Sequence, residues 1–180
     1  MFLALMVLIT LLGGLVRAES QPDIHIANGG ATERYERAVD EVAISSQRNA
    51  ISKLNTLINK YRGTNREAAL LVKLAEFQQQ TAAIEFRIAH GLAHNSKQSI
   101  DLNNYKLIMA ESIKTLSRVL AVYSGNMNVI DEVAPAFVMR GRAYEEIGNK
   151  AAATRDYLEL IKRIPDSPET VRAYMALAEF

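Results

Sequence analysis

The chain has 180 residues, carries 21 basic and 20 acidic side chains, and contains no cysteine. A nearly neutral chain without a basic run offers no electrostatic surface for nucleic acid or for an anionic membrane. Disulfides and a lipid anchor on cysteine are excluded as well, so the fold must be held by packing alone, for which about 160 residues suffice.

The first 18 residues are typical of a secretory signal peptide. Residues 1–16 are almost wholly apolar but fall short of the ~20 apolar residues that a membrane-spanning helix needs. Val16 and Ala18 are small residues where signal peptidase accepts them, which predicts cleavage after Ala18 and a periplasmic or secreted protein. The usual basic cluster before the apolar core is missing, so an uncleaved anchor in the inner membrane is the alternative.

Residues 19–31 form a polar stretch with a proline and two adjacent glycines, which predicts a flexible linker. The next segments, TERYERAVDEVAISS and QRNAISKLNTLINKY, indicate a first helical hairpin that would break near Ser45 and Ser46. Its second helix has the clearer one-face spacing of apolar residues. From residue 32 onward, no alternating apolar pattern is long enough for a strand, and the class predicted is all-α.

A longer hairpin follows, with a first helix from about Asn65 to His90 and a second from about Asp101 to Tyr123. Gly91 is the expected stop of the first helix, and GLAHNSKQS the connection. Asn65 and either Ser99 or Asp101 are the expected N-caps, because their side chains can accept bonds from free backbone N–H groups.

The segment from Pro135 to Pro165 predicts two short helices joined at Gly148. Small residues at Gly141 and Ala153 would let the two helix backbones approach, with aromatic side chains filling the space beside them. Pro165 would end the second helix because proline has no N–H to continue the ladder. The residues predicted to pack within and between repeats are Ala75, Phe137, Gly141, Tyr144, Ala153, Tyr157, Pro165 and Ala178.

A final helix is predicted to begin at Ser167-Pro168-Glu169, with a cap, a proline at the first position and an early acid. Its end repeats an earlier sequence: LAEF occurs at 74–77 and again at 177–180. We expect the repeats to continue beyond residue 180. The apolar residues of this last helix would then be partly uncovered, which predicts self-association through it.

The pattern of Phe137, Gly141, Tyr144, Gly148, Ala153, Tyr157 and Pro165 resembles the tetratricopeptide repeat (TPR) family. The resemblance implies a short α-solenoid over residues 32–180, a TPR-like stack of antiparallel helical hairpins with an enlarged middle hairpin. Two positions depart from the family pattern, because Arg140 stands where leucine is usual and Leu160 where alanine is usual. Members of the family are usually scaffolds that hold other proteins.

The resemblance also implies a partner-binding groove lined by the first helix of each hairpin. Carried over position by position, it names Val72, Glu76, Gln79, Val138, Arg142 and Glu145. The lysine and asparagine set that clamps a partner's terminal carboxylate in some TPR proteins is absent. The expected partners are other proteins of a bacterial cell-envelope complex, and no cofactor is implied.

Catalytic motifs are scarce in the chain. His90 and His94 have the spacing of two zinc ligands on one helix face, but Gly91 argues against a continuous helix there, and no third ligand is evident. We expect two loop histidines and no metal site. An enzyme or enzyme subunit is the alternative function, with a site built from Glu76, His90 and His94 or with a catalytic part beyond residue 180.

Overall fold

A computed structural model describes residues 29–96 and 99–180, and within these ranges the chain is helical, with no strand. This confirms the all-α class. The described residues divide into two units, the first ending at Tyr35 and the second comprising Glu36–Phe180. In the first unit, the described residues begin at Gly29, which is also the first residue of α1. The α-helices are α1 (Gly29–Lys60), α2 (Asn65–Ser96), α3 (Asn103–Tyr123), α4 (Ile130–Glu146), α5 (Lys150–Arg163) and α6 (Pro168–Ala178), and a 3₁₀ turn, η1, spans Met127–Val129.

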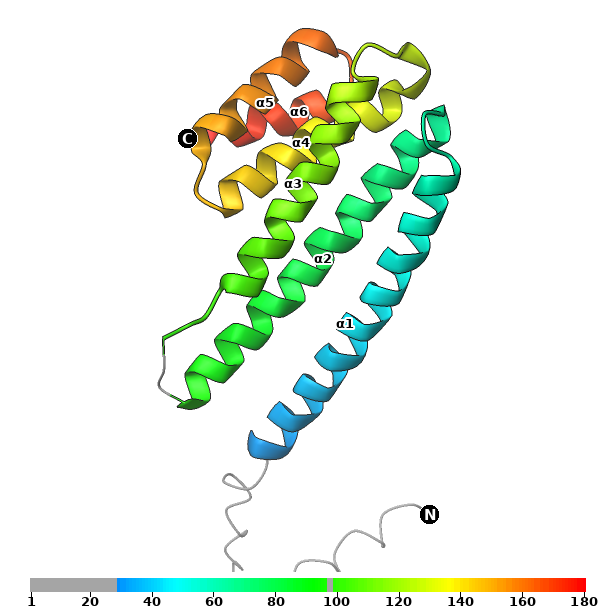
Figure 1. Ribbon diagram of the computed structural model, residues 1–180. Coiled ribbons are helices and arrows are strands. Elements are labelled where there is room, and N and C mark those ends of the chain that lie inside the picture. Colours follow the sequence, from blue (N-terminus) through cyan, green and yellow to red (C-terminus); the bar gives the residue numbers. More distant parts are fainter. Residues whose placement is uncertain (1–28, 97–98) are drawn as a thin grey trace, which may run out of the picture. The chain divides into compact units, whose positions relative to one another are not determined.

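Within the second unit, each helix from α2 to α6 packs against the next helix along the chain (Figure 1). Two further contacts skip one helix, because α2 also packs against α4 and α4 against α6. The helices α2 to α6 therefore form one packed assembly in which α4 occupies a central place. We call this the five-helix assembly.

One continuous cluster of apolar side chains holds the five-helix assembly together. Leu116 and Val119 of α3, Val133 of α4 and Tyr157 and Leu160 of α5 are all completely buried in it. Burial of side chains of this size stabilises a fold by about 1.5–3 kcal/mol each before the entropy of ordering them is counted. The same cluster takes in Ile58 near the end of α1.

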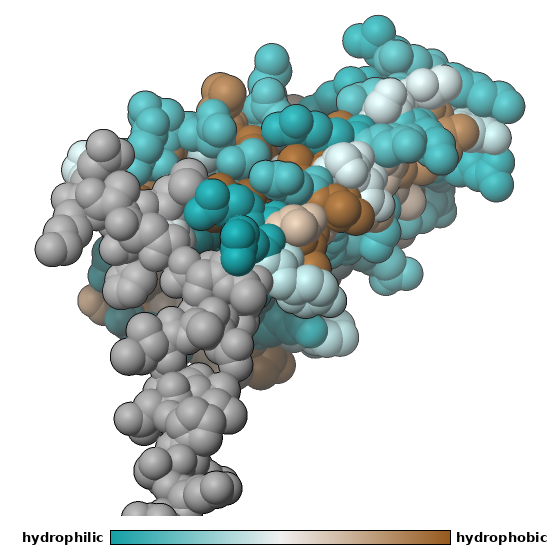
Figure 2. Space-filling view, turned by 90° about the horizontal axis from the view of Figure 1, so that it is seen from below, coloured by the Kyte–Doolittle hydropathy of each residue, from teal (hydrophilic) through white to brown (hydrophobic). Residues whose placement is uncertain are grey.

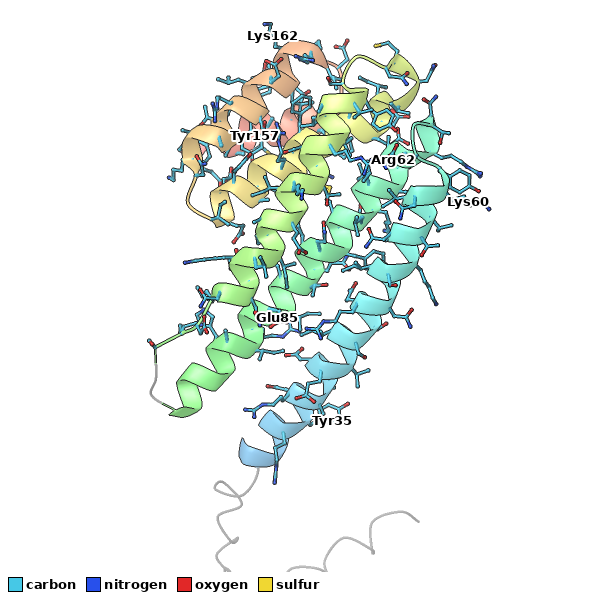
Figure 3. The ribbon with its side chains drawn as sticks, in the orientation of Figure 1. Tyr35, Lys60, Arg62, Glu85, Tyr157 and Lys162 are labelled. Carbon is cyan, nitrogen blue, oxygen red and sulfur yellow. The ribbon has the colours of Figure 1, made fainter. Side chains whose placement is uncertain are left out.

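From Glu36 onward, α1 is held by both apolar and polar side chains. Ile51, Leu54 and Ile58 pack with the apolar cluster, and polar pairs join α1 to α2. Arg87 donates two hydrogen bonds to the carboxylate of Asp40, one of them from Nε at 3.2 Å. We call this set the polar seam, and its residues are Asp40, Gln47 and Arg48 on α1 and Gln80, Glu85 and Arg87 on α2. Figure 3 shows Glu85 on the side of α2 that faces α1. Large apolar residues of α1, Val39, Val42 and Leu57, are exposed.

The turn between α4 and α5 is fixed by backbone geometry at Gly148, as the sequence predicts. Gly148 has a φ of 81°, a left-handed conformation that favours glycine. Its N–H donates to the carbonyl of Glu145 at 2.8 Å, and the Asn149 N–H donates to that of Tyr144 at 2.7 Å, which is a Schellman motif. Asn149 then caps α5, because its side-chain oxygen accepts from the N–H of Ala152 at 3.1 Å.

Gly141 permits the close packing of α4 on α5. A Cβ added there would lie 2.5 Å from Cε1 of Tyr157, whose ring is fully buried (Figure 3). The residue expected to face Gly141 was Ala153, but the three nearest atoms all belong to Tyr157. Ala153 is itself buried in the main cluster. The aromatic ring lies directly on the glycine, so the contact is tighter than two small residues would make it.

The unusual Arg140 has a partner on α5. Its Nε donates to Oδ2 of Asp156 at 2.8 Å and its NH2 donates to Oδ1 at 2.5 Å, while NH1 donates to the hydroxyl of Ser117 on α3. Both side chains are largely buried, and the bidentate pairing gives the carboxylate the hydrogen bonds that it loses when it is removed from water. This pair explains how a charged residue is accommodated where the family pattern has leucine.

The predicted first hairpin is wrong, because α1 runs without a break from Gly29 to Lys60. The serine pair does not end the helix, since the hydroxyl of Ser45 donates to the carbonyl of Val42 in the same helix at 2.9 Å. The start of α1 also lies inside the segment predicted as linker, whose residues before Gly29 are outside the described ranges.

The predicted stop at Gly91 is also wrong, because α2 continues through it to Ser96. A Cβ at Gly91 would meet no atom within 4 Å, so the glycine is neither strained nor needed for packing. The next helix begins at Asn103, and the carboxylate of Asp101 accepts from its N–H at 2.9 Å. Farther on, α4 begins at Ile130, before Pro135, which lies inside the helix.

The last helix begins as predicted, with the Ser167 side chain accepting from the Glu169 N–H at 3.0 Å and Pro168 at the first position. Pro165, exposed, follows the end of α5 at Arg163. The two LAEF segments have different surroundings, because Ala75 is fully buried and Ala178 is exposed. Other helices pack over Ala75, whereas no described helix packs over Ala178.

Figure 2 shows one face of the molecule, where hydrophobic residues lie among a mostly hydrophilic surface.

Candidate partner-binding surface

The structure places two of the six predicted groove residues in the core. Val72 and Val138 are buried in the main apolar cluster, so neither is available to a partner. Spacing along a helix identifies which positions share a face, but it does not show how closely two particular helices approach.

Two other predicted residues are engaged in different ways. The carboxylate of Glu76 pairs with Lys73 one turn earlier on α2, at 2.6 Å. Glu145 has one carboxylate oxygen buried without a hydrogen-bond partner, and the nearby hydroxyl of Tyr157 is buried and likewise unpartnered. Burial and the neighbouring Glu145 carboxylate raise the pKa of Tyr157, so the phenol stays protonated at any physiological pH.

The remaining two, Gln79 and Arg142, line one hollow of about 420 Å³ between α2, α3 and α4. Its walls are mainly apolar: Ala83 and Phe86 follow Gln79 along one face of α2, while Met109 comes from α3 and Ala143 from α4. Tyr105 and Glu146 complete the lining. Concave apolar sites with a few placed polar groups are typical of binding sites.

The side-chain amide of Gln79 holds the floor of this hollow together. Its Nε2 donates to the hydroxyl of Ser112 on α3 and to the carbonyl of Met139 on α4, each at 3.1 Å. One side chain therefore ties three helices at the point where they diverge. Gln79 positions the walls and has no free N–H to offer a partner.

A second polar contact links α3 to the last turn of α4 at the rim. The hydroxyl of Tyr105 donates to Oε2 of Glu146 at 2.8 Å. Burial and the acceptor Glu146 raise the pKa of Tyr105 to about 12, so the donor stays protonated at neutral pH. The ring of Tyr105 also lies 5.4 Å from that of Phe86, which joins the rim to the apolar wall.

Arg142 is the cation of this surface. Its side chain is exposed and makes no hydrogen bond or ion pair with any described residue. Three other arginines, Arg87, Arg118 and Arg140, are each paired with a carboxylate on another helix. The hollow thus combines an apolar wall with one uncommitted guanidinium.

Sequence reasoning found Gln79 and Arg142 but missed the apolar wall. Ala83 and Phe86 stand four and seven residues after Gln79, the spacing of one helix face, so the periodicity of α2 carried this signal. No sequence signal pointed to Tyr105 or Met109, because only the packing of α3 on α2 brings these side chains to the hollow.

Of the alternative enzymatic site, Glu76 and His90 both lie on α2. Within the described ranges, no group of three or more histidine, cysteine, aspartate or glutamate side chains could hold a metal ion. The ring of His90 lies 4.2 Å from that of Phe86. The continuity of α2 places positions 90 and 94 one turn apart, but the His94 side chain lies outside the described residues.

Comparison of the chain with protein-family models, with curated proteins and with solved structures found no match. None of the helices in the described ranges combines the length and apolarity that crossing a bilayer requires. The apolar leader and its cleavage position lie outside those ranges.

Proposed function

We propose that this chain is a TPR-like scaffold of the bacterial cell envelope that binds a segment of another protein in the hollow between α2, α3 and α4. The observation that carries the proposal is the pairing of an apolar wall with the uncommitted Arg142 in that hollow. The bound segment would insert an apolar side chain beside Phe86 and place an acidic group against the guanidinium.

The contact pattern of the helices supports a TPR-like arrangement. In a solenoid of hairpins, each helix meets the next one, and the first helices of successive hairpins also meet. The contacts of α2 with α4 and of α4 with α6 follow this rule, and α3 and α5 would then be the second helices. The Gly141–Tyr157 contact and the Gly148 turn lie where the family pattern puts its small residue and its turn.

Site-specific photocrosslinking in cells tests the proposed surface. A photoreactive amino acid at Ala83, which lines the hollow, should capture a defined protein, whereas the same group at Leu107, exposed on α3 outside the lining, should not. The captured protein is then purified and its affinity measured directly.

A charge reversal then tests the role of Arg142. Arg142→Glu should weaken binding of the purified partner about tenfold or more, because an attractive pair becomes a repulsive one. Arg155→Glu is the matched control, since Arg155 is exposed on α5 and does not line this hollow. Equal losses in both variants, or none in either, would refute the proposed site.

We also propose that the chain is exported and cleaved after Ala18, on the strength of the apolar leader and its small-residue ending. Mass spectrometry of protein recovered from the periplasm should give an N-terminus at Glu19. Recovery of intact Met1 in the membrane fraction would establish the anchor instead.

A further inference from the structure

The outward face of α6 is apolar and is covered by no described helix. Val171, Tyr174 and Met175 are 61%, 58% and 63% exposed, although each is a large apolar side chain. The opposite face packs on the assembly through Ala173, which is fully buried, and Thr170. An apolar helix face of this kind indicates an interaction surface.

The charges at the two ends of this face are opposite and uncommitted. Arg172 near the start and Glu179 at the end are both exposed, and neither makes a hydrogen bond or ion pair through its side chain with a described residue. At 100° per residue, Arg172 and Glu179 lie within about 20° of each other, on one side of Met175. Val171 and Ala178 lie together on its other side.

This arrangement is self-complementary. If a second α6 packs antiparallel with Met175 near a twofold axis, Arg172 of one copy comes level with Glu179 of the other to within about one residue rise of 1.5 Å. The same operation sets Val171 against the small Ala178 of the second copy, which lets the two helices approach. Each contact occurs twice, as a twofold interface requires.

We propose that two copies of this chain associate through the outward face of α6, with Met175 at the axis and two reciprocal Arg172–Glu179 pairs. A second copy fits better than an unrelated partner because the face carries both the cation and its matching anion at symmetric positions. The inference does not rest on the hollow between α2, α3 and α4.

Sedimentation velocity over a range of concentrations tests the association. The parent chain should show a monomer–dimer equilibrium, and Met175→Asp should shift it strongly to monomer, because it places two carboxylates at the axis. Circular dichroism checks that the variant keeps its helices. A parent that stays monomeric at millimolar concentration would overturn the proposal.

A charge-swap series tests the geometry. Arg172→Glu and Glu179→Arg should each raise the dimer dissociation constant about tenfold, and the double variant should restore it. Mixing the two single variants should give a heterodimer, since both cross-pairs are then attractive. Arg155→Glu, on α5, should leave association unchanged. Dimerisation that is indifferent to the swaps would show that another surface is responsible.

Discussion

The two faces of α2 are held in contrasting ways. Toward α3 and α4 it is packed into a continuous apolar cluster in which side chains such as Leu116 and Val133 are wholly buried. Toward α1 it makes the polar seam, whose arginines are largely exposed, and only Ile51, Leu54 and Ile58 of α1 join the apolar cluster. Apolar burial does not weaken with salt and is lost only when the cluster opens, whereas exposed ion pairs contribute little. We therefore expect the five-helix assembly to unfold as one unit and the part of α1 that makes the polar seam to open before it.

The largest effect should come from the apolar cluster. Leu160→Ala removes a fully buried side chain of α5 and should lower the free energy of unfolding by about 2–5 kcal/mol. Leu158→Ala on the same helix is the control, since Leu158 is 53% exposed and should change stability by less than about 0.5 kcal/mol. Urea unfolding followed by circular dichroism measures both. Similar losses would show that α5 is not packed as described.

The next effect concerns the buried carboxylate at the start of α2. Glu67 is 2% exposed and accepts from the Gly63 N–H at 2.5 Å and from the Tyr123 hydroxyl at 2.7 Å, and it pairs with Arg118. Glu67→Gln should cost about 2 kcal/mol at neutral pH, because a bond to a charged group is weakened in a buried place. Glu76→Gln on the same helix should cost no more than about 1 kcal/mol, since its pair is exposed.

The stabilisation by Glu67 should decrease as the pH falls. Burial alone raises the pKa of Glu67, but the bonds from Gly63 and Tyr123 and the charge of Arg118 outweigh it, so the folded-state pKa is lowered. Its contribution to stability is present above the ordinary glutamate pKa and is lost as the pH falls through the lowered value. The unfolding free energies of the parent and of Glu67→Gln should therefore converge in acid. A constant difference would contradict this.

A smaller and local effect is expected at the polar seam. Asp40→Asn weakens the Arg87 contact and should speed hydrogen exchange in α1 about fivefold, equivalent to ~1 kcal/mol, without changing the slowest amides of α3 and α5. Arg48→Ala should have almost no effect, because its contact with Glu85 spans 3.7 Å and the arginine is 70% exposed. Equal acceleration throughout the second unit would mean that α1 and the assembly open together.

The smallest expected effect is an increase in stability. Gly91 lies in the helical interior of α2 with open space around its Cα, so Gly91→Ala should stabilise the protein by about 0.5–1 kcal/mol. The melting temperature measures it. A loss of stability would show that the helix ends at Gly91, as the sequence alone indicated.

Local sequence signals predicted several helices and one turn correctly. Periodicity and turn chemistry located α3, α5, α6 and the Gly148 turn, because Ser167, Asn149 and Gly148 act on their own backbone neighbours. The same local logic misjudged Ser45 and Gly91, since a helix tolerates serine or glycine when the rest of it is supported.

The candidate site was only half predictable. Arg142 and Gln79 are positions that the TPR resemblance implies, and both line the hollow. Val72 and Val138 are also positions of the implied groove, but both are buried in the apolar cluster. How closely helices pack around a given position is not encoded in any local sequence pattern. Tyr105 is brought to the rim by the packing of α3 on α2, and there it bonds to Glu146, forty-one residues away in sequence.

Asn149 belongs to two helices at once, since its N–H completes the end of α4 and its side chain begins α5. A joint shared in this way fixes the two helices together with contacts that are close along the chain, and the entropy of closing so short a loop is small. We expect α4 and α5 to pair early in folding and, during synthesis, as soon as both have left the ribosome. The hairpin would then be the surface on which α6 docks when that helix emerges.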